Sequence, residues 1–176
     1  MGLSFMEKQV LEEKVKKHLD LYGYSSERDT YVDIVDFVRS HGFIVGNAKL
    51  DDNEDGFLAI RPKKAQNKDA KIIGVNFSRD LALKRFIIAH EFAHSVLHYN
   101  EGEVFLHREN KKGKNEEEND ADYFAAALLM PKDSFVRMYT QLKTEGLTPS
   151  AICTKLALIY NVPLESAVRR IDEVCA

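Results

Sequence analysis

Apolar residues recur every three or four positions in two segments near the start of the chain, as on the buried face of an amphipathic helix. The first segment runs from about residue 7 to residue 21, and the second from about residue 31 to residue 40. Gly42 follows the second segment, in a position where glycine commonly ends a helix. The pattern therefore predicts two helices before any strand.

Three short apolar runs come next, at residues 43–45, 57–60 and 71–76. Each has the length and the branched or aromatic side chains of a β-strand. The polar segments DDNEDG and PKKAQNKD separate them, and their composition is that of hairpin loops. We expect a small three-stranded sheet.

Helical periodicity returns from about residue 81 to residue 99. The polar stretch HRENKKGKNEEEND, which begins at His107, has charges of both signs and predicts an exposed loop. A helix over residues 116–130 should end before Pro131, because proline disfavours helical geometry in the residue before it. Pro131 can open another helix, to about residue 143, and two final helices should flank the turn at residues 161–163.

No repeat and no Gly/Ser-rich linker divides the chain. The 176 residues are enough for one hydrophobic core and too few for two full domains. We therefore predict a single α+β domain over residues 1–176. It would comprise an N-terminal helix (1–30), a core with the sheet (31–143) and a helical C-terminal hairpin (144–176).

Composition narrows the function classes. The formal net charge of −3 provides no general attraction to nucleic acid, so we expect no direct nucleic-acid binding. The two cysteines, Cys153 and Cys175, form no CxxC pair, and we expect a core residue and a tail thiol in a reducing cytoplasm. No segment has the length of an apolar membrane span, so we expect no membrane partner.

The candidate chemistry lies in the run HEFAH at residues 90–94. Positions four apart share one face of a helix, so the imidazoles of His90 and His94 can reach one cation. Histidine nitrogen suits Zn²⁺, and two such ligands leave room for a third ligand and a water. Glu91 could take a proton from that water as it attacks a peptide carbonyl. The run therefore has the HExxH pattern of zinc peptidases.

No histidine extension follows His94, so the third ligand must lie elsewhere in the chain. Glu118, near the start of the helix at 116–130, is the candidate. Asp122 lies one turn further on the same face, where a carboxylate can accept the distal N–H of a ligand histidine. The alternative is a solvated acidic helix start with Asn115 as its cap, as we expect for the acids at residues 116–117.

The segments HEFAHSVLH and ENDADYFAAALLMP together resemble the ImmA/IrrE family of zinc metallopeptidases. The resemblance implies a zincin-like domain in which His90, His94 and Glu118 bind Zn²⁺ and Glu91 is catalytic. Asp122 stands where the family usually has asparagine. An aspartate can still accept a hydrogen bond from a ligand imidazole, but it alters the charge at the metal.

Several other residues have more than one interpretation. His98 continues the histidine face but lies two turns from His90, so we expect a structural or cleft-edge residue instead of a ligand. A donor for the tetrahedral oxyanion could be Tyr99, His107, Tyr123 or Tyr139, and spacing does not choose among them. The C-terminal segment resembles a helix-turn-helix that ends in Arg169-Arg170, but its acids balance its bases, which favours a packed hairpin.

The family resemblance also implies a substrate class. Its members commonly cleave helix-turn-helix transcriptional repressors of phages, mobile elements or stress regulons, so we expect a protein partner of that kind. A regulatory protein-binding module that keeps the metal site but acts by contact is the alternative. The two hypotheses differ in whether Glu91 is needed.

Overall fold

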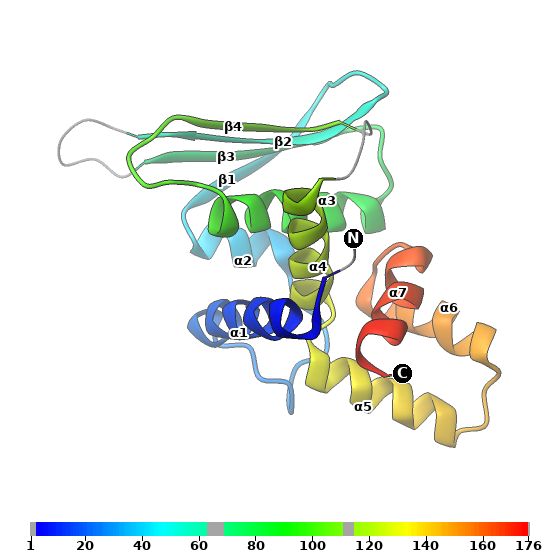
Figure 1. Cartoon of the computed structure of the whole chain (residues 1–176). Coiled ribbons are helices and arrows are strands. Elements are labelled where there is room, and N and C mark those ends of the chain that lie inside the picture. Colours follow the sequence, from blue (N-terminus) through cyan, green and yellow to red (C-terminus); the bar gives the residue numbers. More distant parts are fainter. Residues whose placement is uncertain (1–2, 63–68, 111–114, 176) are drawn as a thin grey trace.

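The structure is a computed structural model that describes residues 3–62, 69–110 and 115–175, with the side chains of residues 109–110 left aside (Figure 1). Seven helices and four strands follow one another in these residues. In chain order they are α1 (Phe5–Tyr22), α2 (Ile34–Ser40), β1 (Phe43–Ala48), β2 (Glu54–Arg61), β3 (Ala70–Asn76), α3 (Leu81–Leu97), β4 (Phe105–Asn110), α4 (Glu116–Leu129), α5 (Lys132–Thr144), α6 (Pro149–Tyr160) and α7 (Leu164–Val174).

The α+β class is confirmed, and the predicted helices and the first three strands form close to the expected positions. Polar side chains fix several helix starts: Asp33, Asp80 and Asn115 accept hydrogen bonds from backbone N–H groups in the first turns of α2, α3 and α4. These side chains satisfy donors that the helix itself leaves unpaired. The predicted loops at residues 63–68 and 111–114 lie outside the described residues.

The prediction of three strands was wrong, because the sheet has a fourth strand, β4. Part of the segment interpreted as an exposed loop pairs antiparallel with β2, opposite residues 54–60. The strand order is β1-β3-β2-β4, with β1 and β3 parallel and the other pairs antiparallel. An edge strand tolerates charged residues, since one of its sides remains open. The polar and charged residues from His107 onward therefore made this part of the strand resemble a loop in the sequence.

The helices cover one face of the sheet. In Figure 1, α3 runs along the underside of the strands, with α2 beside it and α4 crossing toward α5. The inner face of the sheet presents Leu58, Ile60 and Ile73, all buried, and Ile87 of α3 is buried beneath them. This packing places the middle of α3 directly under the strands.

Gly56 permits the close approach of β2 to α3. A Cβ atom at this position would lie 2.4 Å from Cγ2 of Ile87 and 3.0 Å from the backbone oxygen of Gly74. It would also lie 3.6 Å from Oε1 of Glu91. Glycine is therefore required where the sheet lies over the HEFAH turn of α3.

Small residues allow α4 to lie against α3. Ala121 and Ala125 on α4 and Ala93 on α3 are fully buried. A helix that presents alanine brings its backbone close to its neighbour, so polar side chains on the two helices can meet. The start of α4 is therefore held against the turn of α3 that carries the histidines.

The C-terminal segment packs as a hairpin of α6 and α7. Tyr160 and Ala167 are fully buried in it. The guanidinium of Arg170 is also buried, with Nη1 2.7 Å from Oε1 of Glu12 on α1. Nε of Arg169 lies 3.0 Å from Oε1 of Glu173. The two arginines therefore contact acids of this chain.

No helix in the described part of the chain has both the length and the apolar character needed to cross a membrane.

Candidate metal centre

The HEFAH turn places three polar side chains inside the protein. His90, Glu91 and His94 lie near the middle of α3 and are 1%, 0% and 2% exposed. Polar groups are costly to bury unless they are paired, so the contacts of these side chains decide what the turn can do.

Glu118, in the first turn of α4, meets both histidines. Its Oε2 lies 3.1 Å from Nε2 of His90, and its Oε1 lies 3.5 Å from Nε2 of His94. The two imidazole Nε2 atoms are 3.0 Å apart. Within the residues that the structure describes, this trio is the group of histidine, cysteine and acidic side chains whose ligand atoms converge within 4.8 Å. The residues expected to bind a metal are thus brought together.

Each of the two histidines also has a partner at its other ring nitrogen. Nδ1 of His90 lies 3.1 Å from Oδ1 of Asp122, the carboxylate one turn beyond Glu118 on α4. Nδ1 of His94 lies 2.9 Å from Nδ1 of His98. On the far side of Asp122, Nη1 of Arg169 lies 3.6 Å from Oδ2. These contacts leave the Nε2 atoms of both histidines facing Glu118.

His107 reaches the same cluster from β4. Its Nδ1 lies 3.0 Å from Oε2 of Glu91, and its Nε2 lies 3.0 Å from Oε1 of Glu118. Its ring stacks on His94, with centroids 3.7 Å apart and planes inclined by 23°. The cluster therefore draws on three elements, of which the sheet edge supplies one.

The comparison with known families agrees with this arrangement. The model of the family described as IrrE N-terminal-like domain, a peptidase family, matches residues 39–172, which include α3, β4 and α4. The chain belongs to the ImmA/IrrE family. A search of the curated proteins gave no match. ImmA/IrrE proteins form a metallopeptidase family, so membership indicates a hydrolase that acts on a protein substrate.

The electrostatics of this ImmA/IrrE centre separate the protonation states of its groups. Burial lowers the pKa of His94 to about 4, which keeps the imidazole neutral, the form that binds a metal. Hydrogen bonds from His107, His90 and His94 hold the pKa of Glu118 far below its usual range. Burial raises the pKa of Glu91, against the opposing effect of His107. Although burial lowers the pKa of His107, its contacts with Glu118 and Glu91 outweigh this and raise it to about 9.

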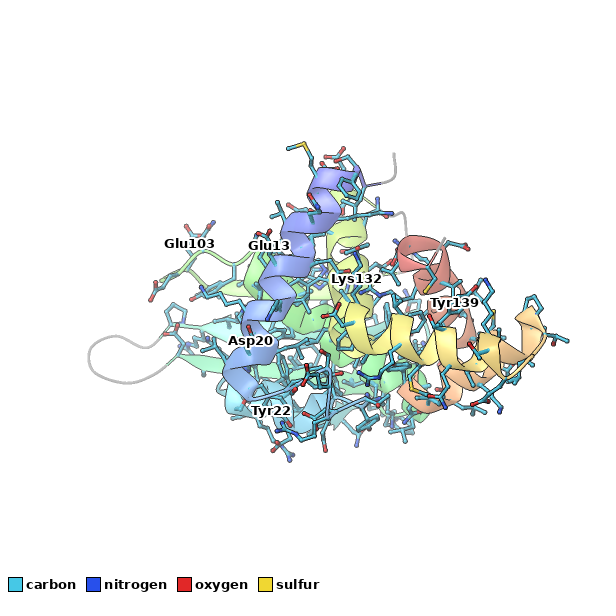
Figure 2. All side chains as sticks on the ribbon, turned by 90° about the horizontal axis from the view of Figure 1, so that it is seen from below. Glu13, Asp20, Tyr22, Glu103, Lys132 and Tyr139 are labelled. Carbon is cyan, nitrogen blue, oxygen red and sulfur yellow. The ribbon has the colours of Figure 1, made fainter. Side chains whose placement is uncertain are left out.

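Of the four side chains considered as oxyanion donors, His107 is the one found in this cluster. The hydroxyl of Tyr99 lies 3.4 Å from Asp69, and that of Tyr123 donates to Glu12 on α1. Tyr139 lies on α5, as Figure 2 shows from below the helical side. No local pattern of the sequence selects His107, because β4 begins with two apolar residues and continues with polar ones, without the alternation of a half-buried strand. The partnership of His98 with His94 was not expected, although their spacing of four residues permits it.

Proposed function

We propose that this chain is a zinc-dependent endopeptidase in which His90, His94 and Glu118 bind the metal and Glu91 is the general base. The observation that carries the proposal is the convergence of two imidazole nitrogens and one carboxylate beside a buried glutamate. Membership in a peptidase family supports the same reaction class.

The donor set fits zinc. Two nitrogens and one oxygen are typical ligands of a catalytic zinc site, which keeps a fourth position for water. Ligand atoms about 2.0–2.1 Å from a tetrahedral zinc lie roughly 3.3 Å from one another. Nε2 of His90 lies 3.0 Å from Nε2 of His94 and 3.1 Å from Oε2 of Glu118, and Nε2 of His94 lies 3.5 Å from the other carboxylate oxygen, Oε1. These distances are close to that separation. The cluster therefore requires little rearrangement to bind the ion.

Bound zinc would supply a Lewis acid and lower the pKa of water to about 7. Glu91 would take a proton from the attacking water as the water oxygen bonds to the peptide carbon. The same carboxyl would then give that proton to the leaving amine when the C–N bond breaks. Burial raises the pKa of Glu91, which makes its carboxylate a better proton acceptor. Asp122 and His98 would orient the two ligand imidazoles.

We further propose that the substrate is a helix-turn-helix transcriptional repressor of a phage, mobile element or stress regulon. The resemblance of HEFAHSVLH and ENDADYFAAALLMP to the family supports this class of substrate. The net charge of −3 favours a protein over a nucleic-acid partner. The ion pairs of Arg169 and Arg170 with acids of this chain also argue against phosphate binding by the hairpin.

The metal is tested first, by elemental analysis of the purified protein and by competition with a zinc chelator. We expect about one zinc per chain. Glu118→Ala should weaken zinc binding by more than about 100-fold, because loss of a ligand exceeds the usual 10–100-fold cost of losing an outer partner. Glu117→Ala, at the exposed position before it, is the control and should bind zinc as the wild type does. A metal-free wild type would refute the metal site.

Cleavage is tested with a repressor encoded beside the gene. The zinc-loaded protein should convert that repressor into two fragments of defined mass, and chelation should abolish the reaction. An unrelated helix-turn-helix protein of similar size should stay intact. If the neighbouring repressor also stays intact under zinc-loaded conditions, the proposed substrate is wrong.

A further inference from the structure

His107 has no role in the proposed metal site or in proton transfer, yet it contacts both. We propose that His107 is a positioning residue that holds the base Glu91 and the metal ligand Glu118 in place at the same time. The inference rests on the proposed function and assigns one further residue to that site. It follows from three observations: the paired contacts of the ring, its stacking on His94, and its place in the sheet.

The paired contacts tie two carboxylates to one rigid group. An imidazole ring is planar, so its two nitrogens keep a fixed separation and direction. Nδ1 lies 3.0 Å from Glu91 and Nε2 lies 3.0 Å from Glu118. The two carboxylates come from different helices, α3 and α4. The ring of His107 therefore fixes the base relative to the ligand without depending on helix packing alone.

Each carboxylate keeps one oxygen for its own task. In Glu118, His107 contacts Oε1, which also lies 3.5 Å from Nε2 of His94, while Oε2 lies 3.1 Å from Nε2 of His90. In Glu91, His107 contacts Oε2, and Oε1 is left for the proton. A carboxylate bound at one oxygen rotates less freely about its terminal bond, so its second oxygen keeps a defined direction. Ligating carboxylates that are hydrogen-bonded in this way bind metal more tightly.

The position of His107 is set by the register of the sheet. His107 pairs with Leu58 of β2, and its ring points to the same inner face as that buried leucine. A slip of one residue would turn the ring outward and put Leu106 or Arg108 in its place. The ring is also held by stacking on His94 at 3.7 Å. The strand, and not a loop, therefore delivers the side chain, which favours a fixed position over a mobile one.

Zinc affinity measured by chelator competition tests the inference without any substrate. His107→Phe keeps an aromatic ring for stacking on His94 but removes both contacts with the carboxylates. We expect it to weaken zinc binding by about 10-fold or more, in line with other outer partners of metal ligands. His41→Phe is the matched control, since His41 is a half-buried ring that packs on Phe37 and Phe92. The His41→Phe variant should bind zinc within about 2-fold of the wild type. A 2-fold change in affinity is a small free-energy difference beside the 10-fold change expected for His107→Phe.

Two conservative variants separate positioning from packing. The side-chain amide of Gln can replace Nε2, and that of Asn can replace Nδ1. His107→Gln should therefore restore the contact with Glu118 and bind zinc within about 3-fold of the wild type. His107→Asn should restore the contact with Glu91 alone and bind zinc as weakly as His107→Phe. The unfolding temperatures of the metal-free variants, measured by circular dichroism, should lie within about 3 °C of one another.

The inference is overturned if His107→Phe binds zinc as the wild type does, or if the Gln and Asn variants bind it equally. It is also overturned if the wild type binds no zinc, in which case the proposed function fails with it. If the wild type binds zinc with the expected order of variants but cleaves no repressor, the inference stands and only the proposed substrate fails. The zinc and cleavage assays thus separate the two.

Discussion

Glu91→Gln is expected to slow cleavage by about 1,000-fold, within the range that a general base contributes to a reaction. Glutamine has the shape of glutamate but cannot accept the proton of the attacking water. Glu91 is fully buried and is not among the converging ligand atoms, so zinc binding should persist. Single-turnover cleavage of the repressor by the zinc-loaded proteins, compared at equal metal occupancy, gives the ratio of rates.

Glu103→Gln provides the matched control. Glu103 is an exposed acid in the loop before β4 and lies at the periphery of the molecule in Figure 2, so its replacement should leave the rate unchanged. The same substitution at Glu91 also separates a peptidase from a module that acts by contact. A module of that kind would still relieve repression in cells as a Glu91→Gln variant, and such a result would contradict the proposed reaction.

Local patterns in the sequence were sufficient to predict the helices and to select most of the candidate site residues that these helices carry. The apolar residues of α3 recur around His90 and His94, and a spacing of four on one helix fixes which side chains share a face. By the same geometry Glu118 and Asp122 share one side of α4, and both meet His90 in the structure. Such short-range geometry can be predicted because the regular spacing of a helix fixes the direction of every side chain on it.

Contacts between distant segments could not be predicted from local patterns in the sequence. β4 forms because its backbone pairs with β2, nearly 50 residues earlier in the chain, and no local signal encodes that pairing. Its charged residues suit an exposed loop as well as an edge strand. The sequence therefore predicts a loop at His107 and does not distinguish this residue from three tyrosines as the oxyanion donor. The contact of Arg169 with Asp122 likewise depends on how the hairpin packs.

Arg170 lies where the C-terminal hairpin joins the rest of the fold. Its Nη1 is 2.7 Å from Glu12 on α1, and its Nε donates to the backbone oxygen of Met130 at 3.1 Å. The hydroxyl of Tyr123 on α4 donates to the same Glu12 at 3.0 Å. One buried guanidinium therefore connects α7 with α1 and with the end of α4.

Arg170→Met is expected to lower the free energy of unfolding by about 3–5 kcal/mol, because it leaves Glu12 and the largely buried Glu173 without their buried cation. For a chain of this length that loss corresponds to a fall of roughly 10 °C in the unfolding temperature. Arg169→Met is the control: its guanidinium is 45% exposed, so the loss should stay below about 1 kcal/mol. Urea unfolding of both metal-free variants measures the difference. Equal losses at the two positions would show that the buried ion pair does not fasten the hairpin to the fold.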